Sequence, residues 1–154
     1  MQKRIRWVQI RDLARVMELE KNCFEKPWEF DAFYMLAIGR GHLKDRAIEV
    51  EMAVYESDGE VIGYTVWECN LSDKRGHVLN IAVQKECRRQ GIATLLLGFV
   101  LEDLRQRNAV SCFLEVREHN LPARKLYEKM GLVSIGRSSH YYGGEDAIIY
   151  QIRL

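Results

Sequence analysis

The stretch HVLNIAVQKECRRQGIATLLLGFVL, residues 77–101, constrains the fold more than any other part of the chain. Its first seven residues are mostly apolar and predict a buried strand. After Gly91, apolar residues recur at positions 92, 95, 96, 99 and 100, the spacing of a helix with one face on a core. The stretch therefore predicts a strand, a turn and a helix in direct succession.

Further strands are expected on both sides of this unit. Residues 48–54 and 61–67 predict two strands joined by an Asp58-Gly59 turn, which is a strong hairpin signal. The remaining strands are expected over residues 5–10, 111–116, 133–139 and 147–154.

Helices are expected over residues 13–24 and 30–38, and another follows Asn120 and ends at Gly131. Antiparallel strands early in the chain and alternating strands and helices at its centre predict a mixed α/β sheet flanked by helices. No repeat, linker or low-complexity segment divides the chain. We therefore expect a single domain over residues 1–154.

Composition excludes several classes of function. Lys and Arg total 23 and Asp and Glu total 22, so no global field recruits nucleic acid or an anionic membrane surface. The four cysteines are scattered without a CxxC pair, which predicts neither a zinc site nor a disulfide framework. The longest apolar stretch is about half of a bilayer span, and no signal peptide is visible. We expect a cytoplasmic, soluble protein without a metal.

The turn between the strand and the helix has the properties of an anion site. The helix that starts at Ile92 has no side chain to cap its free N–H groups, so these donors and the positive end of the helix dipole face the turn. Gly91 allows close approach of a ligand, and Arg88 and Arg89 add positive charge. The competing interpretation is a solvated basic turn, which is the commoner meaning of a single glycine-containing turn.

The position of the turn favours the anion site. The spacing Arg88-x-x-Gly91-x-Ala93, between a strand and an amphipathic helix, resembles the acetyl-CoA pyrophosphate loop of the GNAT superfamily of N-acetyltransferases. It matches neither a Walker loop nor a Rossmann fingerprint. The resemblance implies a GNAT fold, with a largely antiparallel sheet splayed at its centre, and implies that acetyl-CoA is held by Ile81, Val83, Arg88, Arg89, Gln90, Gly91, Ile92, Ala93 and Asn120.

Within that set, the resemblance implies different kinds of contact. Ile81 and Val83 would offer backbone groups to the amide-bearing pantetheine arm, as an added strand would, while their side chains lie in the core. Asn120 would face acetyl-CoA and also cap a helix, and these roles are compatible.

The last forty-one residues, from LEVR to the end, look like the C-terminal half of the RimI-type subfamily, which acetylates the N-terminal amine of a ribosomal protein. The shared elements are LEVR, N, LYEK, YY and EDA in that order, with KPW at residues 26–28 as a fainter match. Two segments differ from the subfamily, the short Gly143-Gly144 turn and residues 39–51. Both would border the acceptor channel, so the acceptor remains open.

Transfer from a thioester to an amine requires a neutral amine, a polarised carbonyl and a stabilised or protonated thiolate. The resemblance implies that Glu115 is the base and Tyr127 the acid. The alternatives are a surface ion pair of Glu115 with Arg117 or Lys125, and a core role for Tyr127.

His77 and Glu68 are rival bases, because both lie near strand ends. A peptide α-amine has a reference pKa of about 8 against about 10 for lysine, which favours an N-terminal acceptor. We therefore expect a protein N-terminal acetyltransferase with direct attack in a ternary complex. The alternatives are a GNAT enzyme acting on lysine, polyamine or another small amine, and a non-catalytic acyl-CoA sensor, which would not need Glu115 and Tyr127 together.

Overall fold

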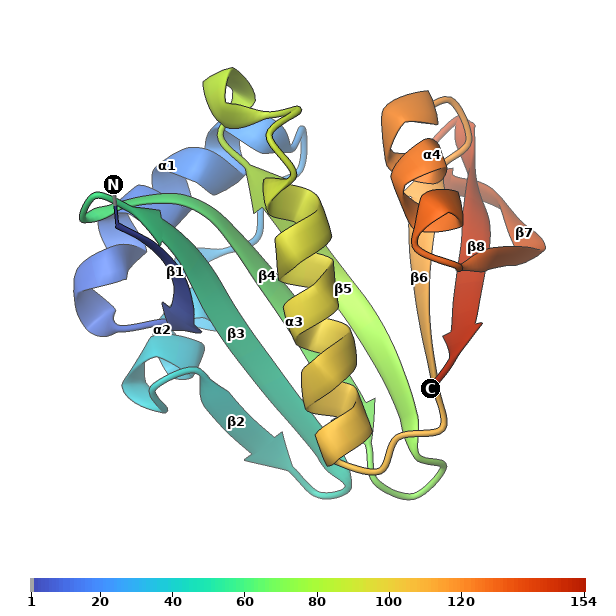
Figure 1. Ribbon diagram of the computed structural model, residues 1–154, viewed down its shortest axis with the longest axis horizontal. Coiled ribbons are helices and arrows are strands. Elements are labelled where there is room, and N and C mark those ends of the chain that lie inside the picture. The colour runs from blue at the N-terminus through green and yellow to red at the C-terminus, as the bar shows by residue number, and fades with distance from the viewer. Residues whose placement is uncertain (1) are drawn as a thin grey trace.

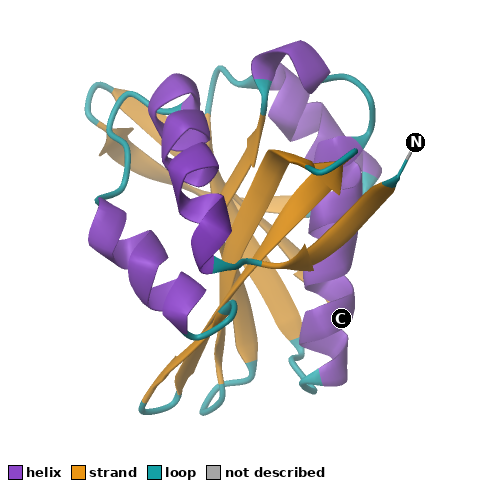
Figure 2. Ribbon diagram, turned by 90° about the vertical axis from the view of Figure 1, so that its left-hand side faces the viewer, coloured by secondary structure: helices purple, strands orange, loops and turns teal. Residues whose placement is uncertain are grey.

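In the computed structural model, which describes residues 2–154, one twisted sheet lies between two groups of helices (Figures 1 and 2). Its eight strands run in the order β1-β3-β4-β5-β6-β8-β7, and β2 pairs with β3 outside this path. All pairs are antiparallel except β5 with β6. The strands are β1 Lys3–Trp7, β2 His42–Asp45, β3 Ile48–Ser57, β4 Glu60–Asn70, β5 Arg75–Val83, β6 Ser111–Arg117, β7 Val133–Tyr142 and β8 Glu145–Arg153.

Two groups of helices cover the sheet. The helices are α1 Leu13–Cys23, α2 Phe30–Ile38, α3 Ile92–Gln106 and α4 Leu121–Lys129. One apolar cluster joins α1 and α2 to β3 and β4, and another joins α3 and α4 to β6 and β8. The mixed α/β class predicted from the sequence is confirmed. No helix within residues 2–154 is long and apolar enough to cross a membrane.

The local elements agree closely with the sequence patterns in most places. Helix α2 has the predicted bounds, and the β3–β4 hairpin turns at Asp58 and Gly59, both with positive φ. The buried face of α3 differs from the prediction, because Leu95 is 53% exposed whereas Leu97 and Leu101 are buried. Leu96, Leu97, Val100 and Leu101 centre the buried stripe on the sheet, so Leu95 points away from it.

The first strand is shorter and earlier than predicted, because a 3₁₀ turn occupies Ile10–Asp12. Asp12 is buried there and receives the Arg6 guanidinium at 2.8 Å. Strand β2 was not predicted, since its sequence HLKD has no apolar alternation. It exists through pairing with β3, where the His42 ring contacts the buried Glu51 and lies 4.4 Å from the Trp7 ring.

The parallel pair β5–β6 opens the sheet. These strands pair only from Arg75–His77 to Ser111–Phe113, and Figure 1 shows them diverging beyond that point. A register shift between Val66 and Trp67 of β4 leaves Leu79 of β5 as an extra residue. Such a bulge bends its strand and increases the local twist. The sheet is therefore splayed at its centre, as the family resemblance implied.

Candidate active site

The three candidate bases lie side by side on three adjacent strands. Glu115 Oε2 on β6 is 2.8 Å from His77 Nε2 on β5, and His77 Nδ1 is 3.6 Å from Glu68 Oε1 on β4. Their side chains are 17%, 19% and 31% exposed, so they are partly shielded but reachable. From the sequence, these residues were alternative candidates for the catalytic base. In the structure they form one polar row.

The two carboxylates have different relations to the imidazole. His77 Nε2 lies within hydrogen-bonding distance of Glu115 Oε2, at 2.8 Å. The 3.6 Å from His77 Nδ1 to Glu68 Oε1 is too long for a hydrogen bond and leaves an electrostatic contact. The ion pairs of the described residues place Glu115 against His77, and not against Arg117 or Lys125 as the alternative interpretation required.

A stacked aromatic ring fixes the His77 imidazole. The Phe113 ring is 4.0 Å away at an interplanar angle of 12°. The Arg75 guanidinium carbon lies 4.3 Å from the centroid of the same Phe113 ring. His77 and Phe113 are the last paired residues of β5 and β6, so the imidazole lies where the two strands begin to diverge.

Tyr127 lies on the inner face of α4, and its ring is 5.9 Å from that of Tyr150. Burial raises the pKa of Tyr127 to about 12, and Tyr142 contributes to the shift. The hydroxyl therefore keeps its proton at neutral pH. Among the hydrogen bonds within residues 2–154 none involves this hydroxyl, and it is not fully buried, so it is accessible to water or to a ligand.

Two more tyrosines, from the β7–β8 hairpin, complete this side of the site. Burial raises the pKa of Tyr142 to about 12, and Tyr141 and Glu115 add to the shift. Burial and the Glu115 charge also raise the pKa of Tyr141. The Arg117 guanidinium carbon lies 4.4 Å from the Tyr142 ring centroid, and Arg117 follows Glu115 by two residues on β6, so Tyr142 lies on the same face of the strand as Glu115.

The turn before α3 has the geometry of an anion site. Helix α3 begins after Gly91 with no side-chain cap, as predicted. Arg89 and Gly91 both have positive φ, 66° and 80°, and no side chain caps the first N–H groups of α3. A Cβ built on Gly91 would meet nothing within 4 Å, so the space in front of it is open to a ligand. These residues fit a phosphate-bearing group.

Arg88 has a structural contact that the sequence did not reveal. Its Nε donates to the Val83 carbonyl at 3.1 Å, and its Nη2 lies 3.5 Å from Cys23 Sγ at the end of α1. The Val83 carbonyl is therefore already used by the turn. The Val83 side chain is buried and Ile81 is partly buried against the core, as predicted for both.

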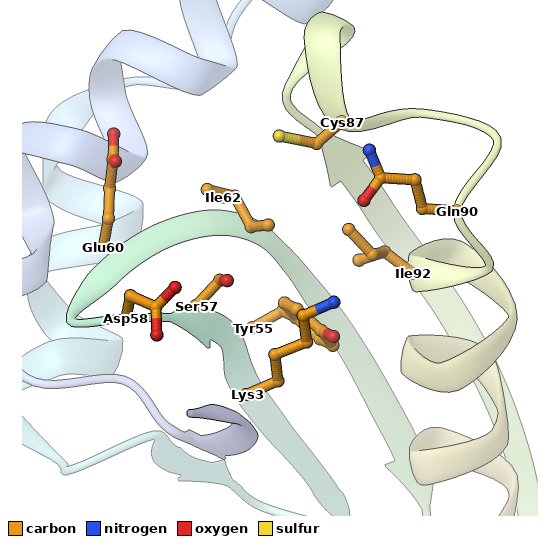
Figure 3. Close-up of a pocket in the computed structure, with 9 residues that line it drawn as sticks. All are labelled: Lys3, Tyr55, Ser57, Asp58, Glu60, Ile62, Cys87, Gln90 and Ile92. Atoms are coloured by element: carbon orange, nitrogen blue, oxygen red, sulfur yellow. The ribbon is translucent and has the colours of Figure 1, made fainter. Parts of the chain in front are cut away.

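Gln90 and Ile92 face a different space from the catalytic groups. Both line a cavity of about 280 Å³ between the turn and the β3–β4 hairpin (Figure 3). The lining includes Ile62 and Cys87 but neither Glu115 nor Tyr127. A ligand on the catalytic side would therefore meet backbone N–H groups of Gln90 and Ile92 and not their side chains.

Asn120 caps α4, as predicted, because its Oδ1 accepts the Ala123 N–H at 3.3 Å. Its contact with acetyl-CoA stays a prediction. Within the described part of the chain, no group of three His, Cys, Asp or Glu side chains could hold a metal ion.

Glu20, a fully buried carboxylate on α1, was not predicted as a site residue from the sequence. Glu20 Oε1 accepts hydrogen bonds from the Tyr64 hydroxyl and from Asn80 Nδ2, and Oε2 accepts the Trp28 N–H at 2.8 Å. It joins α1, the loop before α2, β4 and the bulged part of β5. The sequence pattern that could have indicated its burial is a charged residue on the apolar face of the helix, which includes Leu13 and Val16.

Comparisons with known proteins identify one family. Residues 13–132 match the profile of the acetyltransferase (GNAT) family. The chain is 35% identical to an N-alpha-acetyltransferase of Sulfurisphaera tokodaii, over 95% of this chain and 90% of that protein. It is 30% identical to a putative ribosomal protein bS18-alanine N-acetyltransferase of Bacillus subtilis, over 97% and 95% of the two chains.

A solved structure is similar over nearly the whole fold. The ribosomal-protein-S18-alanine N-acetyltransferase of Escherichia coli superimposes with a TM-score of 0.81 at 25% identity. The match covers 99% of this chain and 94% of that one.

Replacing Glu20 by glutamine is expected to destabilise the protein by about 1–3 kcal/mol, because an amide cannot satisfy three donors and would turn its own N–H₂ toward one of them. Glu18→Gln on the same helix, at a side chain 61% exposed, is the matched control and should change stability by less than about 0.5 kcal/mol. Urea unfolding measures both values. Equal stability of the two variants would contradict the role given to Glu20.

Proposed function

This chain belongs to the acetyltransferase (GNAT) family, and on that premise we propose that it acetylates the N-terminal α-amine of a protein with acetyl-CoA as donor. The observation that carries the proposal is the row Glu68–His77–Glu115 at the splay of β5 and β6, with Tyr141 and Tyr142 beside it. The names of the Sulfurisphaera and Bacillus relatives support the same class of acceptor.

The residues present fit acetyl-CoA, which supplies the acetyl group as a thioester. The uncapped start of α3 and the open space at Gly91 suit the pyrophosphate. The small side chain of Ala93 leaves space for the ligand beside the first turn of α3. The edge of β5 beyond the bulge, which includes Ile81, suits the amides of the pantetheine arm, since an extended chain can add to an open strand edge. Arg89 adds positive charge at the same turn.

The row of bases prepares the acceptor amine. Glu115 accepts a proton from the amine, directly or through one water molecule, and His77 stabilises that carboxylate by its hydrogen bond. Glu68 balances a protonated His77 from the opposite side. The neutral amine then attacks directly in a ternary complex, so no acetylated residue of the enzyme is formed.

Tyr127 completes the proton balance. As the C–N bond forms, the attacking nitrogen becomes positively charged and releases a second proton to water. The C–S bond then breaks, and the departing sulfur gains the proton that the Tyr127 hydroxyl holds. A hydroxyl with a pKa of about 12 stays protonated at neutral pH, and its phenolate is a stronger base than a thiolate, so it regains a proton as soon as it has donated one. Of the two protons that the amine releases, the one taken up by Glu115 restores the Tyr127 hydroxyl through solvent, and the other passes to solvent.

A ribosomal protein with a small first residue is the acceptor that we propose. The Bacillus and Escherichia relatives are named for alanine of protein bS18 or S18, which motivates this finer statement. We propose that residues 1–154 act as one catalytic domain. The free thiols of Cys23, Cys69, Cys87 and Cys112 suit a reducing compartment such as the cytoplasm.

The acceptor is tested by offering peptides that begin with alanine and carry one internal lysine. We expect acetyl transfer to the free α-amine, and no transfer to the same peptide with a blocked N-terminus, because an α-amine loses its proton more easily than a lysine amine. Mass spectrometry of fragments locates the acetyl group. Modification of lysine alone, or of a polyamine alone, would overturn the acceptor and leave the family unchanged.

Tyr127→Phe is expected to lower kcat by about 100-fold, because it removes the proton donor and keeps the packing against Tyr150. The affinity for acetyl-CoA should stay close to that of the wild type. Tyr34→Phe, at a tyrosine 40% exposed on α2, is the control and should leave kcat unchanged. Steady-state kinetics and calorimetry provide the two readouts, and full turnover in Tyr127→Phe would return this residue to a packing role.

A further inference from the structure

The β7–β8 hairpin has an irregular register next to the site. Ser138 pairs with Ala147 and Tyr142 pairs with Glu145, so residues 139–141 of β7 face Asp146 alone. His140, in the middle of this bulge, has a positive φ of 55°. A bulge of this kind bends the strand and re-aims the side chains that follow it.

Asp146 holds the bulge in this conformation. Its Oδ1 accepts the His140 N–H at 3.0 Å, and its Oδ2 accepts a hydrogen bond from Arg137 Nη1 at 3.0 Å. Both hydrogen bonds lower the pKa of Asp146, and the bond from the His140 N–H has the larger effect. Asp146 is therefore ionised at neutral pH, and the bond stabilises an unusual backbone conformation for a non-glycine residue.

Glu145 ties the hairpin to the end of β6. Its Oε2 accepts the His119 N–H at 3.0 Å, and its Oε1 accepts a hydrogen bond from Arg117 Nη1 at 3.2 Å. The Arg117 guanidinium carbon lies 4.4 Å from the centroid of the Tyr142 ring, within the range of a cation–π contact. Glu145 thus supports Tyr142 in two ways. It pairs with Tyr142 across the turn, and it accepts a hydrogen bond from Arg117, which packs on the Tyr142 ring.

The two tyrosines at the end of the hairpin form an angled wall, which we call the acceptor wall. The Tyr141 and Tyr142 rings are 4.8 Å apart at 81°, and Tyr141 is 52% exposed. The charge of Glu115 acts on both. Because Tyr142 packs on Arg117, two residues after Glu115 on β6, the acceptor wall lies on the same face of the sheet as Glu115.

We propose that Glu145 and Asp146 are positioning residues, which set the acceptor wall over Glu115 and thereby determine acceptor affinity without touching the acceptor. This inference rests on the proposed function, because it takes Glu115 as the point to which the amine is delivered. It gives the EDA element of the sequence a physical role: Glu145 anchors the hairpin, Asp146 shapes its bulge, and Ala147 restores regular pairing with Ser138.

The test compares Asp146→Ala, Asp146→Asn and Glu145→Ala with the wild type, using an alanine-first peptide at saturating acetyl-CoA. The KM for the peptide should rise about tenfold in both alanine variants, because misplaced positioning groups weaken binding. The kcat and the affinity for acetyl-CoA should stay within about twofold of the wild type. Asp146→Asn should restore most of the affinity, since its amide oxygen still accepts the His140 N–H.

Two further measurements separate positioning from general damage. Hydrogen exchange of the His140 amide should be faster in Asp146→Ala than in Asp146→Asn, and this readout needs no acceptor. Glu102→Gln, at a side chain 63% exposed on α3, is the matched charge control and should leave the KM unchanged.

An unchanged KM in both alanine variants would overturn the proposal, and so would equal losses of peptide affinity, kcat and acetyl-CoA affinity. If the wild type modifies another amine, the proposed acceptor fails, and the same comparison is made with that amine. A raised KM for it would still support the positioning role, and an unchanged KM would contradict it.

Discussion

The limited pairing of β5 with β6 is the constraint on which the rest of the structure depends. Three residues of each strand pair, from Arg75–His77 and Ser111–Phe113, and the strands then part. Backbone donors and acceptors along the two open edges need partners from water or from a ligand. A ligand with amides along its length fits such an edge, and a phosphate-bearing end fits the uncapped start of α3 beside it.

Buried or half-buried carboxylates support the walls of this opening. On one side, Glu20 holds the loop at Trp28 and the bulged strand at Asn80. On the other side, Asp146 holds the bulge at His140. Between them, Glu115 stays partly exposed against His77. Glu20 and Asp146 each accept hydrogen bonds on both carboxylate oxygens, which suits a structural role, whereas the carboxylate that faces the opening is suited to proton transfer.

The sequence predicted the elements that are fixed by local signals. The bounds of α2 follow from apolar periodicity and the glycines after it, and the β3–β4 turn follows from Asp58-Gly59, whose positive φ values this kind of turn requires. The turn at Gly91 and the cap at Asn120 also depend on local chemistry. The splay at the centre of the sheet was implied by the family resemblance.

Features that depend on distant partners could not be predicted in this way. Strand β2 is polar and forms because β3 is available to pair with it. Arg88 turns inward because the Val83 carbonyl and Cys23 lie within its reach. His77 and Glu115 are 38 residues apart, and only the parallel register of β5 and β6 makes them neighbours and not rivals.

The most direct test of the account is the affinity of acetyl-CoA for Gly91→Glu compared with Gly91→Ala, measured by isothermal titration calorimetry. Both variants share the cost of a side chain at φ 80°, so their difference reports on the charge and bulk placed before α3. If the pyrophosphate binds there, Gly91→Glu should bind acetyl-CoA at least about 100-fold more weakly than Gly91→Ala, because a like charge meets the phosphates. Equal affinity of the two variants would contradict the assignment of this turn and, with it, the placement of acetyl-CoA in the splayed sheet.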